Sequence, residues 1–147
     1  MRLDTRRAEA LSERAKIAVM MTWSAERCRP SGRLVHPLWT PATTTARILS
    51  DGRSPKITDL RANPRLVLTY RSNDEFLVVE ADLTVRTGGP VAELRCEMAA
   101  SPHGYRPEDF WSADDLNHVV LIEVDAVRME LCSFERGELI VSTWRRP

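Results

Sequence analysis

The sequence predicts a mainly β protein, an antiparallel β-barrel that is closed or split, with helices at its periphery. Short segments rich in β-branched and aromatic residues recur along the chain and alternate with turn-forming residues. Most connections between these segments are too short for the repeated crossovers that a parallel sheet requires. Antiparallel pairing, with a few helices inserted between strands, is therefore the expected architecture.

The first part of the chain predicts a helix followed by two strands. Residues 4–15 contain good helix formers and begin with residues that cap helices. The β-branched and aromatic run 16–24 predicts a strand, and residues 29–32, Arg-Pro-Ser-Gly, predict a hairpin turn. The returning strand, 33–40, contains Pro37. We expect this proline at an edge or a bulge, because it has no N–H to donate to a neighbouring strand.

The middle of the chain predicts a strand, a short helix and a hairpin. Residues 43–50 predict the third strand. Ser54 followed by proline predicts the start of a helix over 55–62, because serine can cap free amides and proline at the first position needs no amide partner. The runs 65–71 and 75–86 predict two strands joined by a tight turn.

The last third predicts helices and then strands. Residues 88–101 predict a helix, and 107–116 predict a second, short helix. Segments 119–130 and 138–144 predict the final two or three strands. With 147 residues and a mass of 16.7 kDa, the chain has the size of one domain, which we expect to span residues 1–147.

The charge balance excludes several classes of function. The 21 Lys and Arg residues balance the 21 Asp and Glu residues to a formal net charge of 0. This balance disfavours a protein that acts by neutralising nucleic-acid backbones or by coating an anionic membrane. The N-terminal segment is charged and has no apolar run long enough to be an export signal or a membrane anchor. We therefore expect neither nucleic acid nor a membrane as partner.

The cysteines and histidines predict no metal site. Cys28, Cys96 and Cys132 are odd in number, and none lies near another cysteine or a histidine at the short spacings of zinc sites. They are typical of reduced thiols in a cytoplasmic protein. His103 falls in a predicted loop, where solvent exposure without a function is the simpler interpretation.

The junction between the strand 43–50 and the helix 55–62 is the segment richest in binding chemistry. A helix N-terminus presents unpaired amides and a partial positive charge. Here it is flanked by a guanidinium at Arg53, a hydroxyl at Ser54 and an ammonium at Lys56. This combination suits a phosphate monoester, although an ordinary surface helix with basic neighbours would have the same residues.

Residues 49–70, LSDGRSPKITDLRANPRLVLTY, resemble the pyridoxamine 5'-phosphate oxidase-like, FMN-binding split-barrel family. The matching pattern is a Ser-Asp turn, an Arg-Ser-x-Lys segment, a short helix, and Asn-Pro-Arg at the start of a hydrophobic strand. Residues 32–39 look like the second strand of that family. The resemblance extends over residues 16–85 and is looser elsewhere, and it implies an antiparallel split β-barrel of the FMN-binding type.

The resemblance implies a cofactor site. Arg53, Ser54 and Lys56 would hold the FMN phosphate, and Ser50 would add a hydroxyl or backbone contact. The residues that would run beside the isoalloxazine ring are His36, Pro37, Leu38 and Trp39. Trp144 resembles, as a weaker match, the tryptophan of the tail that closes over the flavin in the oxidases. The family also implies a homodimer with the cofactor at the subunit interface.

Each of these aromatic and imidazole side chains has a structural alternative. His36, beside a proline on a strand, is more often a structural residue than an acid or a flavin ligand. Tryptophans on alternating strand positions usually belong to a barrel core. The pair Asp114 and Asp115 fits a capped, solvated helix better than two catalytic carboxylates.

The departures from the family bear on the substrate. Where the oxidases have a strand with glutamine and arginine that ends in Glu-Gly, this chain has Phe-Leu-Val-Val-Glu-Ala at 76–81. The basic residue at the end of the second strand is also absent, with Leu38 and Trp39 in its place. We therefore expect an FMN-dependent oxidoreductase with an unidentified donor and substrate, and not oxidation of pyridoxamine phosphate. The alternatives are a flavin-binding or flavin-free stress-response module on the same barrel, or a deazaflavin-dependent reductase.

Overall fold

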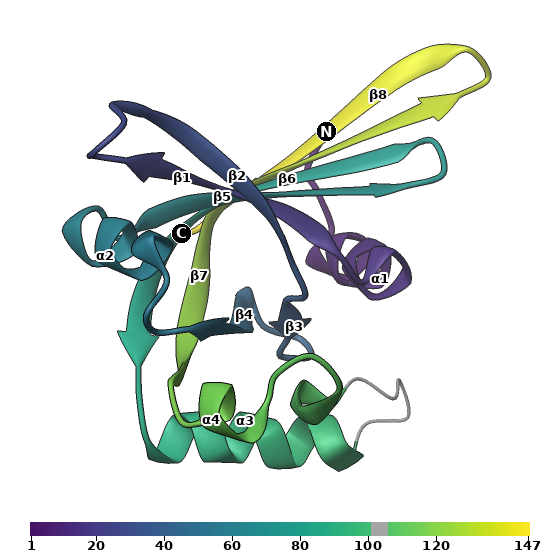
Figure 1. The fold of residues 1–147 in the computed structure, drawn as a ribbon. Coiled ribbons are helices and arrows are strands. Elements are labelled where there is room, and N and C mark those ends of the chain that lie inside the picture. The colour runs from purple at the N-terminus through teal and green to yellow at the C-terminus, as the bar shows by residue number, and fades with distance from the viewer. Residues whose placement is uncertain (101–105) are drawn as a thin grey trace.

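The computed structural model describes residues 1–100 and 106–147 and contains one antiparallel sheet of eight strands that curls into a split barrel (Figure 1). The strands are β1 (Ala18–Ser24), β2 (Arg29–Val35), β3 (Leu38–Trp39), β4 (Thr45–Asp51), β5 (Arg65–Ser72), β6 (Glu75–Arg86), β7 (Val119–Glu135) and β8 (Glu138–Arg145). The helices are α1 (Thr5–Ala15), α2 (Pro55–Ala62), α3 (Gly89–Ala100), the 3-10 turn η1 (Pro107–Asp109) and α4 (Ala113–Leu116). The main strand order is β2-β1-β5-β6-β7-β4-β3, and β8 pairs with β7.

The split in the barrel arises at β7, the longest strand. One edge of β7 pairs with β6. The other edge is shared, because residues 119–125 pair with β4 and residues 128–135 pair with β8. A register shift opposite Glu80 and Ala81 leaves Val127 as an extra residue between these two halves. As a result, β4 and β8 leave β7 in different directions (Figure 1).

The core lies inside this curled sheet and follows the alternation of the strands. Leu68, Leu77 and Val79 point inward and are fully buried. Helix α1 covers β5 and β6 with Leu11, and α2 packs against β1 and β6. Each buried aliphatic side chain of this size contributes about 1.5–3 kcal/mol. A second, smaller cluster lies where α3 packs on β7, and it joins residues of α3, β4 and the start of β7.

The structure corrects two predictions about the first hairpin. The turn lies at residues 25–28 and not at 29–32, because Arg29–Val35 already pairs with β1. The returning strand predicted over 33–40 is interrupted at His36 and Pro37, and only Leu38–Trp39 resumes pairing, now with β4. Proline thus ends one ladder and lets the chain cross to another strand.

The remaining elements agree closely with the predictions. The helix predicted over 55–62 is α2, and the strands predicted over 65–71 and 75–86 are β5 and β6. The second short helix divides into η1 and α4, and two final strands form. His103, and Ser101 at the end of the predicted helix 88–101, lie outside the described residues. No helix in the described part of the chain is long and apolar enough to cross a membrane.

Candidate functional site

The N-terminus of α2 is set in place by a close contact at Gly52. The N–H of Gly52 donates a hydrogen bond to the His118 carbonyl at 2.8 Å, just before β7. A Cβ at position 52 would lie 2.7 Å from that oxygen and 2.8 Å from a methyl carbon of Val120. Only glycine fits this approach. The turn between β4 and α2 is therefore held against the start of β7.

The first turn of α2 has two polar groups that take no part in the hydrogen bonds of the helix. Ser54 occupies the N-cap position, but its hydroxyl accepts no hydrogen bond from an amide of the helix. Pro55 has no N–H, so the first free backbone donor is the N–H of Lys56, which has no acceptor four residues back in the helix. The hydroxyl and this amide are available to a bound anion.

Arg33 of β2 reaches this helix start. Its Nη1 donates to the Ser54 hydroxyl at 3.5 Å, and its Nη2 donates to the Ser31 hydroxyl at 3.3 Å. The Nε of Arg33 is buried and has no hydrogen-bond partner in the part of the chain that the structure describes. Within that part, no carboxylate pairs with this guanidinium. A buried donor without an acceptor is rare in folded proteins, and here it belongs to a guanidinium that also lacks a carboxylate partner in the described chain.

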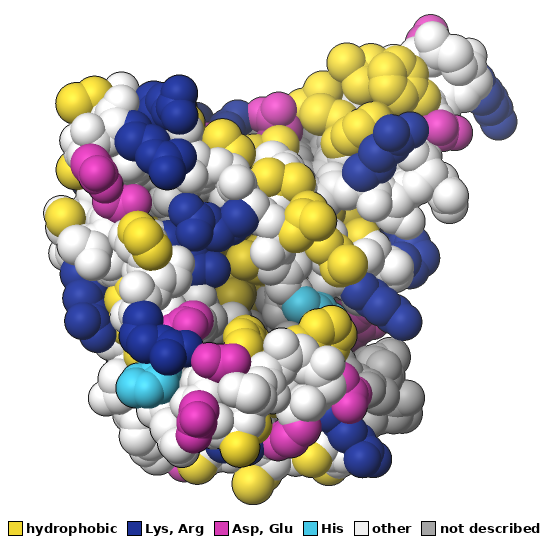
Figure 2. Space-filling view, in the orientation of Figure 1, with side chains coloured by type: hydrophobic (Ala, Val, Ile, Leu, Met, Phe, Trp, Pro, Cys, Tyr) yellow, Lys and Arg dark blue, Asp and Glu magenta, His cyan; other side chains and the backbone are white. Residues whose placement is uncertain are grey.

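Lys56 lies beside Arg33 and is half-buried. Burial, together with the neighbouring Arg33 charge, lowers the pKa of Lys56 to about 8, and the carboxylate of Asp51 only partly offsets this. No ion pair of Lys56 is found among residues 1–100 and 106–147. Two adjacent cations without a bonded carboxylate create a local positive potential. Figure 2 shows Lys and Arg side chains gathered over the region of α2 and β2.

Arg53 has a different environment from Arg33 and Lys56. Its Nε and Nη2 donate to the two carboxylate oxygens of Asp51, at 3.0 and 2.9 Å. Its Nη2 also donates to Asp115 of α4, at 2.7 Å. These contacts raise the pKa of Arg53, hold the pKa of Asp51 at about 2 and lower the pKa of Asp115. Arg53 is thus next to Ser54 in the sequence and lies at the site, but its Nε and Nη2 already donate to carboxylates.

Ser50 completes this corner from β4. Its side chain is 2% exposed, and its hydroxyl has no hydrogen-bond partner among the described residues. In β4 it lies opposite Val120 of β7, two residues before Gly52. Together with the Arg33 Nε, the Ser50 hydroxyl is a second buried polar group near the start of α2 that has no hydrogen-bond partner in the described chain.

The chemistry of this corner fits a phosphate group. Arg33 supplies a guanidinium without a carboxylate partner in the described chain, and Lys56 supplies an ammonium and a backbone amide. Ser54 supplies a hydroxyl that does not cap the helix. Helix N-termini with nearby basic side chains bind phosphates through such donors. The residues present thus fit the phosphate of a nucleotide-like cofactor. We call the five charged side chains here the α2 anion corner; they are Arg33, Asp51, Arg53, Lys56 and Asp115.

The residues predicted to run beside the flavin ring lie in three different places. His36 and Pro37 form the crossing between β2 and β3, directly after the strand that contains Arg33. Leu38 packs on the smaller cluster beside α3. Trp39 packs against the main core, and its indole N–H donates to the Tyr70 hydroxyl at 2.9 Å. Of these residues, His36 and Pro37 are the nearest to Arg33 along the chain.

Trp144 lies at a different place from the corner. It sits on β8, opposite Met129 of β7, and packs against the main core. Its neighbour Thr143 bonds through its backbone to the N-terminal segment, with the Leu3 N–H donating to the Thr143 carbonyl at 2.8 Å. Within one chain, Trp144 thus has a packing role.

Two charged residues of the corner were missed by sequence reasoning. Arg33 is opposite buried Met20 in the β1–β2 ladder, so strand alternation directs it to the inner side of the sheet. An arginine at such a position is a detectable signal, because charged residues rarely face a core without a partner. Asp115 is 62 residues from Arg53 in the sequence, and no local pattern brings the two together.

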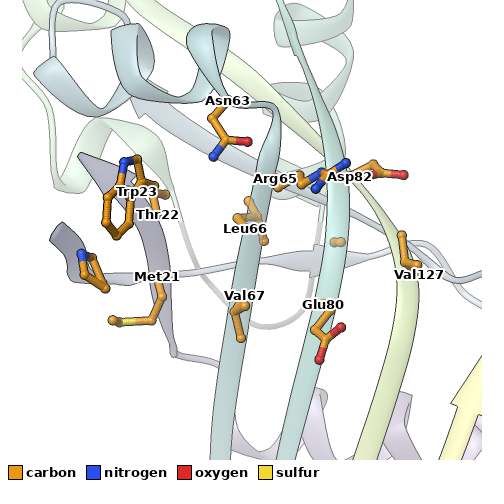
Figure 3. Close-up of a pocket in the computed structure, with 12 residues that line it drawn as sticks. Met21, Thr22, Trp23, Asn63, Arg65, Leu66, Val67, Glu80, Asp82 and Val127 are labelled. Carbon is orange, nitrogen blue, oxygen red and sulfur yellow. The ribbon is translucent and has the colours of Figure 1, made fainter. Parts of the chain in front are cut away.

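A sizeable groove in the described chain lies elsewhere. It is an open groove of about 750 Å³ on the outer side of β1, β5 and β6. Figure 3 shows Met21 and Trp23 along one wall, and Glu80 and Asp82 along the other. Neither Arg33 nor Lys56 lines it. Because Met21 faces the opposite side of the sheet from Met20, the groove and Arg33 lie on different faces.

Comparison with known proteins identifies the fold. No protein-family profile matches the chain, and no curated protein matches it either. Solved structures do match. A pyridoxamine 5'-phosphate oxidase-related, FMN-binding protein from Nostoc punctiforme is 17% identical, with 99% of this chain and 97% of that chain covered and a TM-score of 0.67. The fold is the pyridoxamine 5'-phosphate oxidase-like split barrel.

Two further structures show how varied proteins of this fold are. General Stress Protein 26 from Bacillus anthracis is 14% identical, with 92% of this chain and 95% of that chain covered and a TM-score of 0.68. An F420 reductase is 18% identical, with 82% of this chain and 94% of that chain covered and a TM-score of 0.65. The resemblance seen in the sequence is thus confirmed for the fold, and flavin-type proteins are among the structures that share it.

Proposed function

We propose that the protein is an FMN-dependent oxidoreductase in which the α2 anion corner holds the cofactor phosphate. The observation that carries the proposal is the pair Arg33 and Lys56, two adjacent, partly buried cations with no bonded carboxylate in the described chain. Placing two such charges together is costly unless an anion binds between them. The FMN-binding protein of the same fold supports the choice of cofactor.

The residues of this chain would bind and orient the cofactor. Arg33 and Lys56 would neutralise the phosphate, and the Ser54 hydroxyl and the Lys56 amide would donate to its oxygens at the start of α2. His36 and Pro37, which follow the strand that contains Arg33, are the residues that would contact the ring. A bound flavin itself supplies the hydride and electron transfer chemistry, so the protein needs no dedicated catalytic side chain.

The proposed substrate is not pyridoxamine phosphate. Phe76, at the start of β6, stands where the oxidases have polar residues near the ring, and it is 39% exposed on the outer side of the sheet. The Arg71 guanidinium lies over its ring, 5.5 Å from the ring centroid, and makes a cation–π contact. This apolar strand favours an uncharged or aromatic substrate or donor.

We also propose that the protein is a homodimer with the cofactor at the subunit interface. Large apolar side chains stand exposed on the outer side of the sheet, and Leu34 is 72% exposed. The exposed residues of these strands are Val19, Trp23, Leu34, Phe76, Phe134, Leu139 and Val141. A monomer rarely exposes so many large apolar groups on one sheet. Sedimentation should give twice the chain mass of 16.7 kDa, and a monomer would contradict this proposal.

The first test is the visible spectrum of the purified protein. A yellow protein that releases FMN on denaturation, identified by its mass, is the expected result. Lys56→Ala should weaken FMN binding about tenfold while leaving the unfolding temperature unchanged, because Lys56 contributes one charged contact. The matched control is Lys16→Ala, which removes the other lysine of the chain, outside the corner. A colourless protein that binds no added FMN would contradict the proposal.

A kinetic measurement separates an oxidoreductase from a binding module. Bound FMN should be bleached by a nicotinamide donor faster than free FMN is, because the protein positions donor and ring together. Equal rates would favour the second candidate, a flavin-binding stress-response module, and General Stress Protein 26 has the same fold.

The cysteines are free in the structure, which supports a cytoplasmic location.

A deazaflavin is the alternative cofactor. An F420 reductase has the same fold, and the α2 anion corner makes no contact that distinguishes one ring from the other. The two cofactors differ in their absorption maxima, so the same spectrum and mass measurement identifies which one the protein retains.

A further inference from the structure

Asp115 forms an ion pair with Arg53, a cation that a bound phosphate would otherwise contact. Its Oδ1 accepts from the Arg53 Nη2 at 2.7 Å, and Arg53 immediately precedes the helix cap Ser54. The Nε and Nη2 of Arg53 are both engaged by carboxylates. An anion at the start of α2 therefore meets Arg53 already neutralised, in contrast to Arg33 and Lys56.

The two carboxylates that hold Arg53 have different origins. Asp51 lies in the same turn and also accepts the backbone N–H of Arg53 at 2.9 Å, so it belongs to the turn itself. Asp115 comes from α4, beyond β5, β6 and α3 in the chain. Removing Asp115 would therefore leave the turn intact, whereas removing Asp51 would not.

Asp115 is held in place by its own helix. The Ser112 hydroxyl donates to the Asp115 Oδ2 at 2.8 Å and accepts from the Asp115 backbone N–H at 3.2 Å. Ser112 is thus the N-cap of α4, and its hydroxyl also holds the Asp115 carboxylate without help from Arg53. Asp115 is thus positioned in advance, with one oxygen on Ser112 and the other on Arg53.

The charge count of the corner depends on this residue. Three cations and two carboxylates leave the α2 anion corner with a formal charge of +1, and without Asp115 the charge would be +2. A phosphate monoester carries a charge of about −1.5 to −2 at pH 7, whereas a phosphodiester carries −1. Charge matching at the corner as it stands therefore favours the singly charged ester more than it would without Asp115.

We propose that Asp115 sets the charge of the phosphate group that the α2 anion corner accepts, and weakens its binding of doubly charged monoesters relative to singly charged diesters. This inference rests on the proposed function, since it takes the corner to be the phosphate site of a flavin-type cofactor. Asp115 acts through Arg53 and through its own negative charge. It is a specificity-determining residue and takes no part in electron transfer.

The test compares Asp115→Asn with Asp114→Asn. Asp114 is the adjacent residue of α4, carries the same charge and makes no ion pair in the described chain. Three probes are titrated by fluorescence quenching: FMN, a monoester; riboflavin 4',5'-cyclic phosphate, a diester; and riboflavin, which has no phosphate. The unfolding temperature of each variant shows whether α4 remains folded.

Asp115→Asn should tighten FMN binding about fivefold, the size expected for removing one unit charge from a partly exposed site. The cyclic ester should gain about twofold or less, and riboflavin should not change. Asp114→Asn should leave all three dissociation constants unchanged. Equal gains for both esters, equal effects of the two variants, or weaker FMN binding by Asp115→Asn would each overturn the inference.

Failure of the proposed function gives a different pattern. If no variant binds any flavin, the corner is not a flavin site, and the assignment of the cofactor fails. Inorganic phosphate, titrated by calorimetry against the unmodified protein and Asp115→Asn, then tests Asp115 alone. Tighter phosphate binding by Asp115→Asn would support the role of Asp115 at the corner, and unchanged or absent binding in both proteins would overturn it.

Discussion

The helices α1 and α2 begin with side chains that are both good N-caps, yet only one of them acts as a cap. At α1, the Asp4 carboxylate accepts the Arg6 N–H at 3.0 Å. At α2, the Ser54 hydroxyl accepts from Arg33, and no amide of the helix donates to it. The first helix satisfies its own start, whereas the second leaves amide and hydroxyl open beside two cations.

This difference teaches that a capping residue marks where a helix begins but not what its first turn binds. The local sequence of Asp4 and Ser54 predicts the same role for both. The decisive difference is a strand neighbour, because β2 places Arg33 against the Ser54 hydroxyl, whereas the Asp4 carboxylate accepts an amide of its own helix. The consequences can be measured separately as ligand affinity and as stability.

The largest effect is expected from Arg33→Met. Methionine keeps most of the apolar stem and removes the guanidinium, so the phosphate loses a charge-assisted contact and Lys56 loses its cationic neighbour. FMN affinity should fall about thirtyfold, equivalent to roughly 2 kcal/mol. Fluorescence titration of FMN measures this change.

Arg29→Met is the matched control for that variant. Arg29 lies on the same strand, at its other end, and makes no ion pair in the described chain. Its removal should leave FMN affinity unchanged. Similar losses for both variants would show that the general positive charge of β2, and not the contact at α2, attracts the cofactor.

A smaller effect is expected from pH, through Lys56. Burial disfavours the charged form and places its pKa near 8, and a bound phosphate would favour the charged form again. Binding above pH 8 therefore takes up a proton, and FMN affinity should fall about fivefold as the pH rises from 7 to 9. The Asp51 pKa of about 2 keeps that carboxylate ionised throughout this range, so its charge does not change.

Lys56→Arg tests that assignment directly. Arginine keeps its charge throughout the range, so the fall in affinity between pH 7 and 9 should disappear even if the absolute affinity changes. A pH dependence that persists in Lys56→Arg would assign the titration to a different group.

The sequence predicted the parts of the fold that local chemistry determines. The helix 55–62 has the same bounds as α2, because Ser-Pro starts it and the proline after Asn63 stops it. The β5–β6 hairpin was equally predictable, since two alternating runs flank a short polar turn. The likeness to solved structures then confirmed the barrel.

The features that could not be predicted are the first turn and the full set of residues at the corner, because both depend on which elements become neighbours in the fold. Proline and glycine at 29–32 favour a turn, but pairing with β1 draws those residues into β2. Arg33 and Asp115 join the α2 anion corner only through β2 and α4, which are distant in sequence. Trp39 had a family role assigned to it, and its hydrogen bond to Tyr70 became visible only in the folded chain.

The smallest effect concerns stability and contrasts the two helix starts directly. Asp4→Ala removes a working cap and should lower the free energy of unfolding by about 1 kcal/mol. Ser54→Ala removes a hydroxyl that caps nothing, so the loss should be only a few tenths of a kcal/mol, while FMN binding weakens. Urea unfolding of both variants, without added flavin, measures the difference. If Ser54→Ala costs as much stability as Asp4→Ala, the hydroxyl caps α2 in solution, and the first turn is then closed to a phosphate.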